Sequence, residues 1–187
     1  MTDSRTRLLD AAEDLLWEHG VSATSPRAVL DRSGVGQGSL YHHFPTKTAL
    51  AHAALDRVVQ RSLERALSEL SRPGPAIEAV AAYLARPREG VRGCRVGRHA
   101  SDHLVVTSEE LAEPVRRYFL ELHAAVRERL EEARRSGELH TGDPEELADT
   151  VLATIQGGYV LARATGDQQH LDRAVRGLVT LLRATAP

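Results

Sequence analysis

The sequence has one cysteine, Cys94, in 187 residues, so no disulfide can form within the chain. No basic and apolar signal segment follows Met1 either, and we therefore expect a reducing, cytoplasmic compartment. Apolar runs are short, because Arg, Glu or Gly interrupts each of them well before the roughly 20 residues that a membrane-spanning helix requires. These absences exclude a disulfide-stabilised scaffold and predict a protein that does not enter a membrane.

Aromatic residues are also scarce, at 4% of the chain, and the alternation of apolar and polar residues that is typical of strands is hard to find. Apolar residues instead recur every three or four positions almost throughout. With 42% apolar and 27% charged residues, the composition is that of a globular protein and excludes disordered or fibrous chains. We therefore predict an all-α fold of about nine helices.

The formal net charge is −2, so the chain as a whole is not basic. A protein that binds nucleic acid needs a positively charged surface, and any such function must therefore come from local charge. Between residues 24 and 50 the basic residues Arg27, Arg32 and Lys47 face a single acidic residue, Asp31. This segment is the place to look for contacts with nucleic acid.

Cap and turn residues predict where the helices begin and end. The first helix should end before Gly20, and either Thr24 or Ser25 can cap the second. Thr46 should cap a long helix that the Pro-Gly-Pro break after residue 72 ends. Asp143, followed by a proline and two glutamates, is the clearest helix start in the chain. Further helices are expected over residues 76–86 and in part of residues 97–106. A long helix that contains residues 115–130 should end at residue 136, and the last helix should contain residues 171–182.

The last two expected helices predict a homodimer. The final helix carries an apolar stripe on one face, and the helix before it presents two adjacent small residues. The residues concerned are Leu171, Val175, Leu178 and Leu182 on the stripe, with Gly157 and Gly158 before it. We expect this apolar surface to exceed what one protomer covers, so the prediction is a closed two-fold interface formed by these six residues.

Residues 26–44 have the length and turn chemistry of a helix-turn-helix. Gly34 can take the positive φ angle that a tight corner needs. The outward positions of the second helix are Gln37, Ser39, Tyr41 and His42. The N-terminal part of such a helix enters the major groove, where Gln37 can pair with a base edge and Gly38 leaves room for close approach. The alternative is an ordinary helical hairpin whose tyrosine and histidines pack into a core.

The segment from Gly34 to Lys47, GVGQGSLYHHFPTK, resembles the signature of the TetR family of transcriptional regulators. The resemblance implies a helix-turn-helix DNA-binding domain over residues 1–46, a ligand-binding and dimerisation domain over residues 47–187, and double-stranded operator DNA as partner. It also implies phosphate contacts from Arg27, Tyr41, His43 and Lys47, and base contacts from the positions between Gln37 and His42, Gly38 and Ser39 included. Lys47 is the only lysine. A positive charge at a helix start is disfavoured unless an anion is near, and a DNA phosphate would be that anion.

The C-terminal half, around Gly93-Cys94 and Gly157–Arg163, resembles a TetR subgroup that includes drug-responsive repressors. This resemblance implies an interior cavity for a small-molecule effector that releases a repressor from its operator. The residues expected to line it are Tyr83, Cys94, His99, His103, Tyr118, Phe119, His123 and Tyr159. A dimer that binds DNA without any ligand is the alternative.

Two other functions use the same C-terminal residues. Cys94, His99 and His103 could converge on a metal ion, because histidines four residues apart share one face of a helix. An enzyme with Cys94 as nucleophile is also conceivable, but no orienting residue, oxyanion-hole motif, phosphate loop or carboxylate pair supports catalysis. We therefore expect a regulator without catalytic activity and without a cofactor. Trp17, beside two leucines, is expected to be a core residue.

Overall fold

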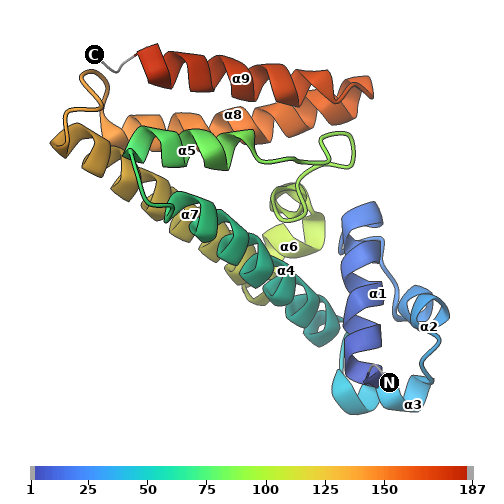
Figure 1. Cartoon of the computed structure of the whole chain (residues 1–187). Helices are drawn as coiled ribbons and strands as arrows, with labels where there is room; N and C mark the ends of the chain where they lie inside the picture. Colours follow the sequence, from blue (N-terminus) through green and yellow to red (C-terminus); the bar gives the residue numbers. More distant parts are fainter. Residues whose placement is uncertain (1–2, 185–187) are drawn as a thin grey trace. The chain divides into compact units, whose positions relative to one another are not determined.

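The structure, a computed structural model, describes residues 3–184 (Figure 1). Within that range the chain forms nine α-helices, one 3-10 helix and no strand, which confirms the predicted all-α fold. The elements are α1 (Ser4–His19), α2 (Pro26–Ser33), α3 (Gln37–His43), α4 (Lys47–Leu70), α5 (Ala76–Ala85), η1 (Gly97–Ser101), α6 (His103–Thr107), α7 (Glu109–Arg135), α8 (Pro144–Thr165) and α9 (Gln169–Ala184).

The helices group into two compact units. The first unit comprises the residues up to Arg61 together with Arg95–Tyr118, and the second comprises Ser62–Cys94 together with the residues from Phe119 onward. Helices α4 and α7 each have residues in both units. The domain boundary that the sequence predicted after residue 46 separates a DNA-binding domain from a regulatory domain by function. Packing into two units does not test this boundary, so it stays a prediction.

In the first unit α1 packs against α2 and α3 through almost fully buried leucines, among them Leu8, Leu16 and Leu40. The cap of α2 is Ser25, whose Oγ accepts a hydrogen bond from the amide of Ala28 at 3.2 Å. The buried Thr24 hydroxyl donates instead to the carbonyl of Gly20 at 2.7 Å. Of the two caps that the sequence allowed, the structure therefore selects Ser25.

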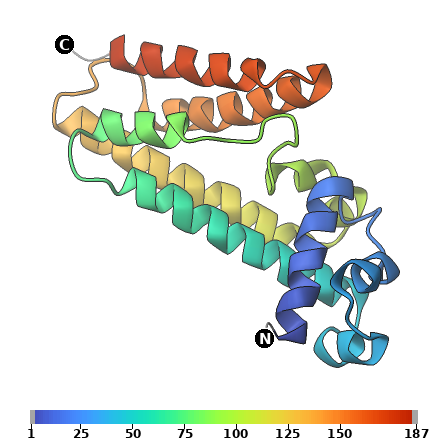
Figure 2. The same ribbon diagram turned by 45° about the vertical axis from the view of Figure 1, so that its right-hand side comes forward.

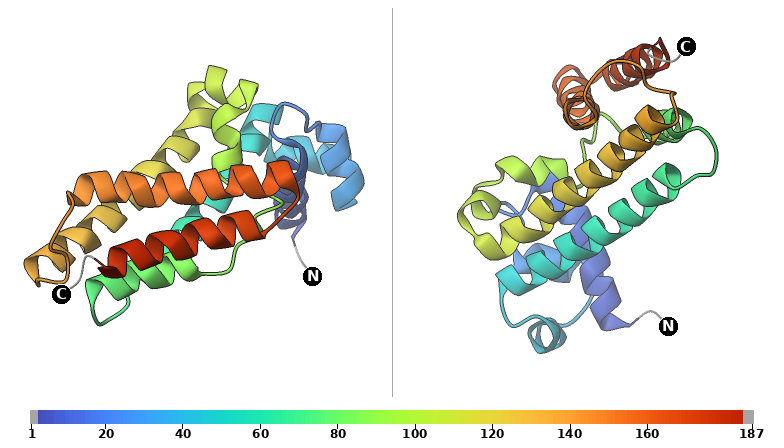
Figure 3. Two further views of the ribbon diagram at one scale, coloured as in Figure 1. Left: turned by 90° about the horizontal axis from the view of Figure 1, so that it is seen from above. Right: turned by 90° about the vertical axis from the view of Figure 1, so that its left-hand side faces the viewer.

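In the second unit α9 lies along both α8 and α5 (Figure 2, Figure 3). Helix α8 begins as predicted, because the Asp143 carboxylate accepts hydrogen bonds from the amides of Glu145 and Glu146. Gly158 allows α8 and α9 to approach closely, since a Cβ atom there would lie 2.6 Å from Cδ1 and 3.1 Å from Cα of Leu171. The sequence had assigned Gly158 to a dimer interface; its position against Leu171 makes it a packing residue inside the protomer.

The apolar stripe of α9 is also part of the protomer core. Its members Leu171, Val175, Leu178 and Leu182 are all buried. The prediction of a dimer interface here assumed that one protomer could not cover these side chains. That assumption is wrong, because packing of α9 against α8 and α5 covers the stripe within the protomer. A role for these residues in a dimer interface stays a prediction.

Among the described residues, no helix combines the length and the apolar character that crossing a lipid bilayer demands. This agrees with the charged or glycine residues that interrupt each apolar run in the sequence.

Candidate DNA-binding site

A tight corner joins α2 to α3. Gly34 adopts φ 63° and ψ 24°, in the left-handed region, and its amide donates to the carbonyl of Leu30 at 2.9 Å. Arg7 of α1 donates from Nη2 to the carbonyl of Ser33 at 2.6 Å, which holds the corner against α1. Val29 on α2 and Leu40 on α3 are each 1% exposed. The predicted role of Gly34 is therefore confirmed, and α2 and α3 both pack against α1, with Val29 and Leu40 buried.

One face of α3 is left open, and we call it the α3 surface: Gln37, Gly38, Tyr41 and His42. All four residues are exposed, and Tyr41 retains 46% of its surface although it is a large aromatic residue. A Cβ atom at Gly38 would meet nothing within 4 Å, so the backbone there is accessible to a close neighbour. Ser39 is half-buried beside this surface. The α3 surface thus presents hydrogen-bond donors and acceptors on a rigid helix.

Three further residues of the predicted site already have partners within the chain. Arg27 on α2 lies 3.0 Å from the carboxylate of Asp31, an exposed pair of the kind that contributes at most about 1 kcal/mol and can exchange for a phosphate. His43 Nε2 lies 2.9 Å from Oγ of Ser4, at the start of α1. Lys47 Nζ donates to the carbonyl of Ser22, in the loop between α1 and α2, at 3.3 Å.

Asp102 connects the segment between η1 and α6 to the same loop. Its carboxylate accepts hydrogen bonds from Ser22 Oγ at 2.6 Å and from the Ser22 amide at 3.1 Å, and it caps α6 by accepting from the Leu104 amide at 3.1 Å. Partial burial acts to raise the pKa of this carboxyl, but the bonds from Ser22 and Leu104 outweigh it and hold the pKa below its usual value. Since the Ser22 carbonyl accepts from Lys47, the hydrogen bonds run from Asp102 through Ser22 to Lys47.

A buried ionic cluster ties α1 to α4. Glu13 on α1 is 6% exposed, and its carboxylate accepts from Nε of Arg57 and from Nη1 of Arg61, the latter at 3.0 Å. Removing one partner from a buried pair of this kind is costly, because a charge is left without compensation. Trp17, also on α1, is buried as expected, and the Arg95 guanidinium lies 3.7 Å from its ring centroid. These contacts fix α1, on which α3 rests.

The residues predicted to line an effector cavity lie in both units. In the second unit Tyr83 and Cys94 are buried and Tyr159 is half-buried; burial raises the pKa of both tyrosines, and Cys94 interacts electrostatically with each. Phe119 and His123 are half-buried, and His123 Nε2 lies 3.3 Å from the carboxylate of Asp149. In the first unit Tyr118 and His99 are buried, whereas His103 is exposed. The structure thus places Tyr83, Cys94 and Tyr159 near one another, and their role in ligand binding stays a prediction.

The geometry does not support the metal-sensor alternative. His99 belongs to η1 and His103 to α6, and Asp102 separates the two helices, so the two histidines do not share one helix face. Burial, followed by the charge of Arg98, lowers the pKa of His99 to about 4. In residues 3–184, no group of three or more His, Cys, Asp or Glu side chains could hold a metal ion.

The sequence could not have revealed the contacts of Glu13 and Asp102. Arg57 lies 44 residues from Glu13, and Ser22 lies 80 residues from Asp102. Neither spacing is a local signal; only the tertiary packing of the first unit creates these pairs.

Comparisons with known proteins agree with this geometry. Residues 8–54 match the family model of bacterial regulatory proteins of the tetR family, and residues 71–178 match the tetracyclin repressor-like C-terminal domain. The chain is 27% identical over 191 residues to the uncharacterised HTH-type transcriptional regulator YxaF of Bacillus subtilis, with 97% of this chain and 96% of YxaF covered. It is 45% identical over 51 residues to the HTH-type transcriptional repressor KstR2 of Rhodococcus jostii, a match that covers 27% of this chain and 25% of KstR2.

The fold is likewise shared with solved structures. The structure of a TetR transcriptional regulator from Chloroflexus aurantiacus superimposes with a TM-score of 0.85 at 25% identity, over 98% of this chain and 96% of the other. The two family models together span most of the chain, from the helix-turn-helix to α9. The chain belongs to the TetR family, and it is a helix-turn-helix, DNA-binding transcriptional regulator rather than an enzyme.

Proposed function

We propose that the protein is a homodimeric repressor that binds a palindromic operator and is released from it by a small-molecule effector. The observation that carries the proposal is the α3 surface, an exposed polar helix face held rigidly by Gly34, Arg7 and buried apolar contacts. KstR2, which shares 45% identity over 51 residues with this chain, is itself a repressor, and this supports repression as the output.

On DNA, each exposed side chain would have a separate task. Gln37 can donate to and accept from an adenine edge in the major groove, and Ser39 can reach a base or a phosphate. Tyr41, His43 and Lys47 would contact phosphates on one side of the groove, and Arg27 at the start of α2 on the other. His43 and Lys47 are already oriented by Ser4 and Ser22, so little side-chain freedom is lost when they bind.

The dimer interface that we propose differs from the one the sequence suggested. We define the α8–α9 surface by three exposed apolar residues, Val160 at 67%, Leu161 at 50% and Leu181 at 66% exposure, together with the exposed Gly157 and Gly177. A Cβ atom at either glycine would meet nothing within 4 Å in the protomer. Large apolar side chains around small residues favour burial against a second copy, and a two-fold pair suits a palindromic site.

Release by an effector needs a ligand that binds one state of the dimer more tightly than the other. Helix α4 has its first residues in the unit that contains α3 and its last residues in the second unit, and is therefore one element, with α7, through which a change in one unit can reach the other. The rival function is a dimer that binds DNA without an effector. It predicts no compound that lowers operator affinity.

The decisive experiment measures binding of the full-length protein to the DNA upstream of its own gene by fluorescence anisotropy. We expect preference for an inverted repeat over shuffled DNA, and an affinity that falls steeply between 50 and 200 mM salt because phosphate contacts release counterions, by roughly 10³-fold or more for several such contacts. Equal affinity for the repeat and for shuffled DNA at every salt concentration would contradict the proposal.

A further inference from the structure

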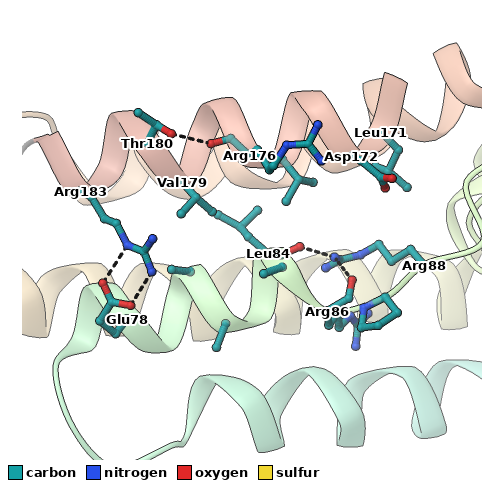
Figure 4. A pocket seen from close by; sticks show the side chains of 15 residues that line it. Glu78, Leu84, Arg86, Arg88, Leu171, Asp172, Arg176, Val179, Thr180 and Arg183 are labelled. Atoms are coloured by element: carbon teal, nitrogen blue, oxygen red, sulfur yellow. Dashed lines mark hydrogen bonds and ion pairs between the residues drawn. The ribbon is translucent and has the colours of Figure 1, made fainter. Parts of the chain in front are cut away.

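A groove runs between α5 and α9 in the second unit (Figure 4). Its volume is about 570 Å³, which lies within the roughly 300–1,000 Å³ of sites that bind small organic molecules. None of the eight residues that the sequence predicted for the effector cavity lines this groove. Its lining therefore differs from the cluster of Tyr83, Cys94 and Tyr159, although Arg86 and Arg88 of the groove contact Tyr83.

One side of the groove is apolar. On α5 it is lined by the small side chains of Ala81, Ala82 and Ala85. The buried Leu84 and Val175 lie between the two helices. Small side chains along one helix leave room for a neighbour, and the apolar atoms that remain accessible favour an alkyl chain or a ring over water. The volume and the wall together suit an elongated apolar body.

The other lining residues give the groove a positive charge. Four arginines face two carboxylates there: Arg86, Arg88, Arg176 and Arg183 against Glu78 and Asp172. Arg183 and Glu78 pair with each other across one end, through bonds of 2.9 and 2.7 Å (Figure 4). Asp172 accepts a hydrogen bond from the Gln168 amide. Apart from the Arg183–Glu78 pair, the groove therefore holds three arginines and one carboxylate, and its net charge is positive.

Two of these three arginines, Arg86 and Arg88, contact neutral groups. Arg88 donates to the carbonyls of Tyr83 at 2.7 Å and Arg86 at 3.0 Å, and the Arg86 guanidinium lies 5.1 Å from the Tyr83 ring centroid. In the part of the chain that the structure describes, neither of them nor Arg176 forms an ion pair. A guanidinium binds a carboxylate through two parallel hydrogen bonds, which makes arginine the preferred partner for that anion.

We propose that the α5–α9 groove binds an amphipathic organic anion: a carboxylate whose head group contacts Arg86 and Arg176 and whose alkyl chain of about ten carbons lies along the alanines of α5. The half-buried Arg86 and the exposed Arg176 supply attraction for the head group, and burial of each methylene of the alkyl chain strengthens binding further. The identity of the anion as effector rests on the proposed function, whereas its binding to the groove does not.

Titration calorimetry of the full-length protein tests the binding. Decanoate is the probe, decylamine keeps the chain and reverses the charge, and butyrate keeps the head and removes most of the chain. We expect decanoate to bind at least tenfold more tightly than either. Equal affinities for decanoate and decylamine would show a merely apolar site and overturn the proposal.

Three variants locate the site. Arg176→Gln removes a groove charge, and Ala85→Trp fills the groove from an exposed position; each should weaken decanoate binding fivefold or more. Arg173→Gln is the matched control, because Arg173 is an exposed α9 arginine that does not line the groove and lies 3.5 Å from Asp167. Circular dichroism verifies that all three variants fold. Equal loss in Arg173→Gln and Arg176→Gln would place binding elsewhere.

Operator binding separates this inference from the proposed function. If decanoate binds the groove and leaves operator affinity unchanged, the groove proposal is kept and the proposal that this anion releases the protein from its operator is wrong. If the protein binds its operator and decanoate does not bind the protein, the proposal of operator binding is kept and the groove proposal is wrong. If decanoate lowers operator affinity in the wild type and in Arg173→Gln but not in Ala85→Trp, both hold.

Discussion

The α3 surface and the α8–α9 surface are both exposed in one protomer, but they expose opposite chemistry. The first presents Gln37, Tyr41 and His42, groups that hydrogen-bond well to water and equally well to DNA. The second presents Val160, Leu161 and Leu181, which gain free energy only when water is removed. A polar surface suits a partner that must leave again, and an apolar surface suits one that stays.

The same contrast separates how the two regions are built. The α3 surface comes from one helix of seven residues, positioned by a glycine corner and by α1. The α8–α9 surface combines two successive helices, and the α5–α9 groove combines two helices that are distant in sequence. Substitutions in one region should therefore leave the local structure of the other intact.

The largest effect is expected from Leu181→Arg, which places a charge on the α8–α9 surface. Sedimentation should show a monomer at micromolar concentration. Affinity for the palindromic operator should fall roughly 10²- to 10⁴-fold, because two linked half-site contacts become one. Thr180→Arg is the control, since Thr180 lies next to Leu181 in sequence but lines the groove toward α5. A Leu181→Arg protein that remains a dimer would place the interface on another surface.

Next in size is the acid sensitivity of the first unit, through His99. Burial lowers the pKa of its imidazole from 6.5 to about 4. Between these two pH values the imidazole is therefore neutral in the folded protein and protonated in the unfolded chain. This contribution to the free energy of unfolding is complete above pH 6.5 and is lost as the pH falls from 6.5 to about 4, by about 3 kcal/mol in total. Urea titrations at several pH values measure it. His99→Gln should flatten the pH dependence, whereas substitution of the exposed His103 by Gln should not.

Substitutions at the DNA-binding site should distinguish residues that recognise bases from residues that contact phosphates. Gln37→Ala should reduce the preference for operator over shuffled DNA by about 1 to 3 kcal/mol for each half-site, because a base edge loses its partner. Lys47→Ala should weaken both DNAs alike and lower the slope of affinity against salt by about 1 for each copy. Anisotropy titrations on both DNAs between 50 and 200 mM salt distinguish the two outcomes. Identical profiles for the two variants would remove the distinction between base and phosphate contacts.

These differences in construction also explain what could be predicted from the sequence. Gly34, Ser25 and Asp143 act on residues within four positions of themselves, so their turn and cap roles follow from local chemistry. The helical character and the apolar face of α9 were equally evident. The partner of that face was not, because α5 lies about ninety residues earlier and covers it within the protomer.

The candidate site divides in the same way. Gln37, Tyr41 and His42 of the α3 surface lie on one short helix, and their exposure was predicted from the spacing of the apolar residues. Ser39 was predicted to face outward with them, but it is half-buried. The groove arginines come from positions 86 to 88 and 176 to 183, and no spacing in the sequence indicates that they line one cavity. Charges with a local partner, such as Arg27 and Asp31, are evident from the sequence, whereas charges that meet through tertiary packing are not.

The smallest expected effect tests whether a tertiary contact supports the DNA-binding side. Asp102→Asn preserves the size of the side chain but removes the charge that accepts two hydrogen bonds from Ser22, and thereby loosens the loop whose carbonyl holds Lys47. Replacing a charged acceptor by a neutral one should lower the free energy of unfolding by about 1 kcal/mol. Because the pKa of Asp102 is lowered in the folded state, the wild type has this stability above the ordinary carboxyl pKa and loses it as the pH falls through the lower folded value; the variant should not show that loss.

Operator and shuffled DNA should both bind roughly threefold more weakly to Asp102→Asn, since a misplaced Lys47 affects phosphate contacts alone. Asp31→Asn, an exposed carboxylate on α2, is the control for loss of one negative charge and should strengthen DNA binding slightly, if it changes it at all. Unchanged or stronger DNA binding by Asp102→Asn would show that the contact with Ser22 does not set the affinity.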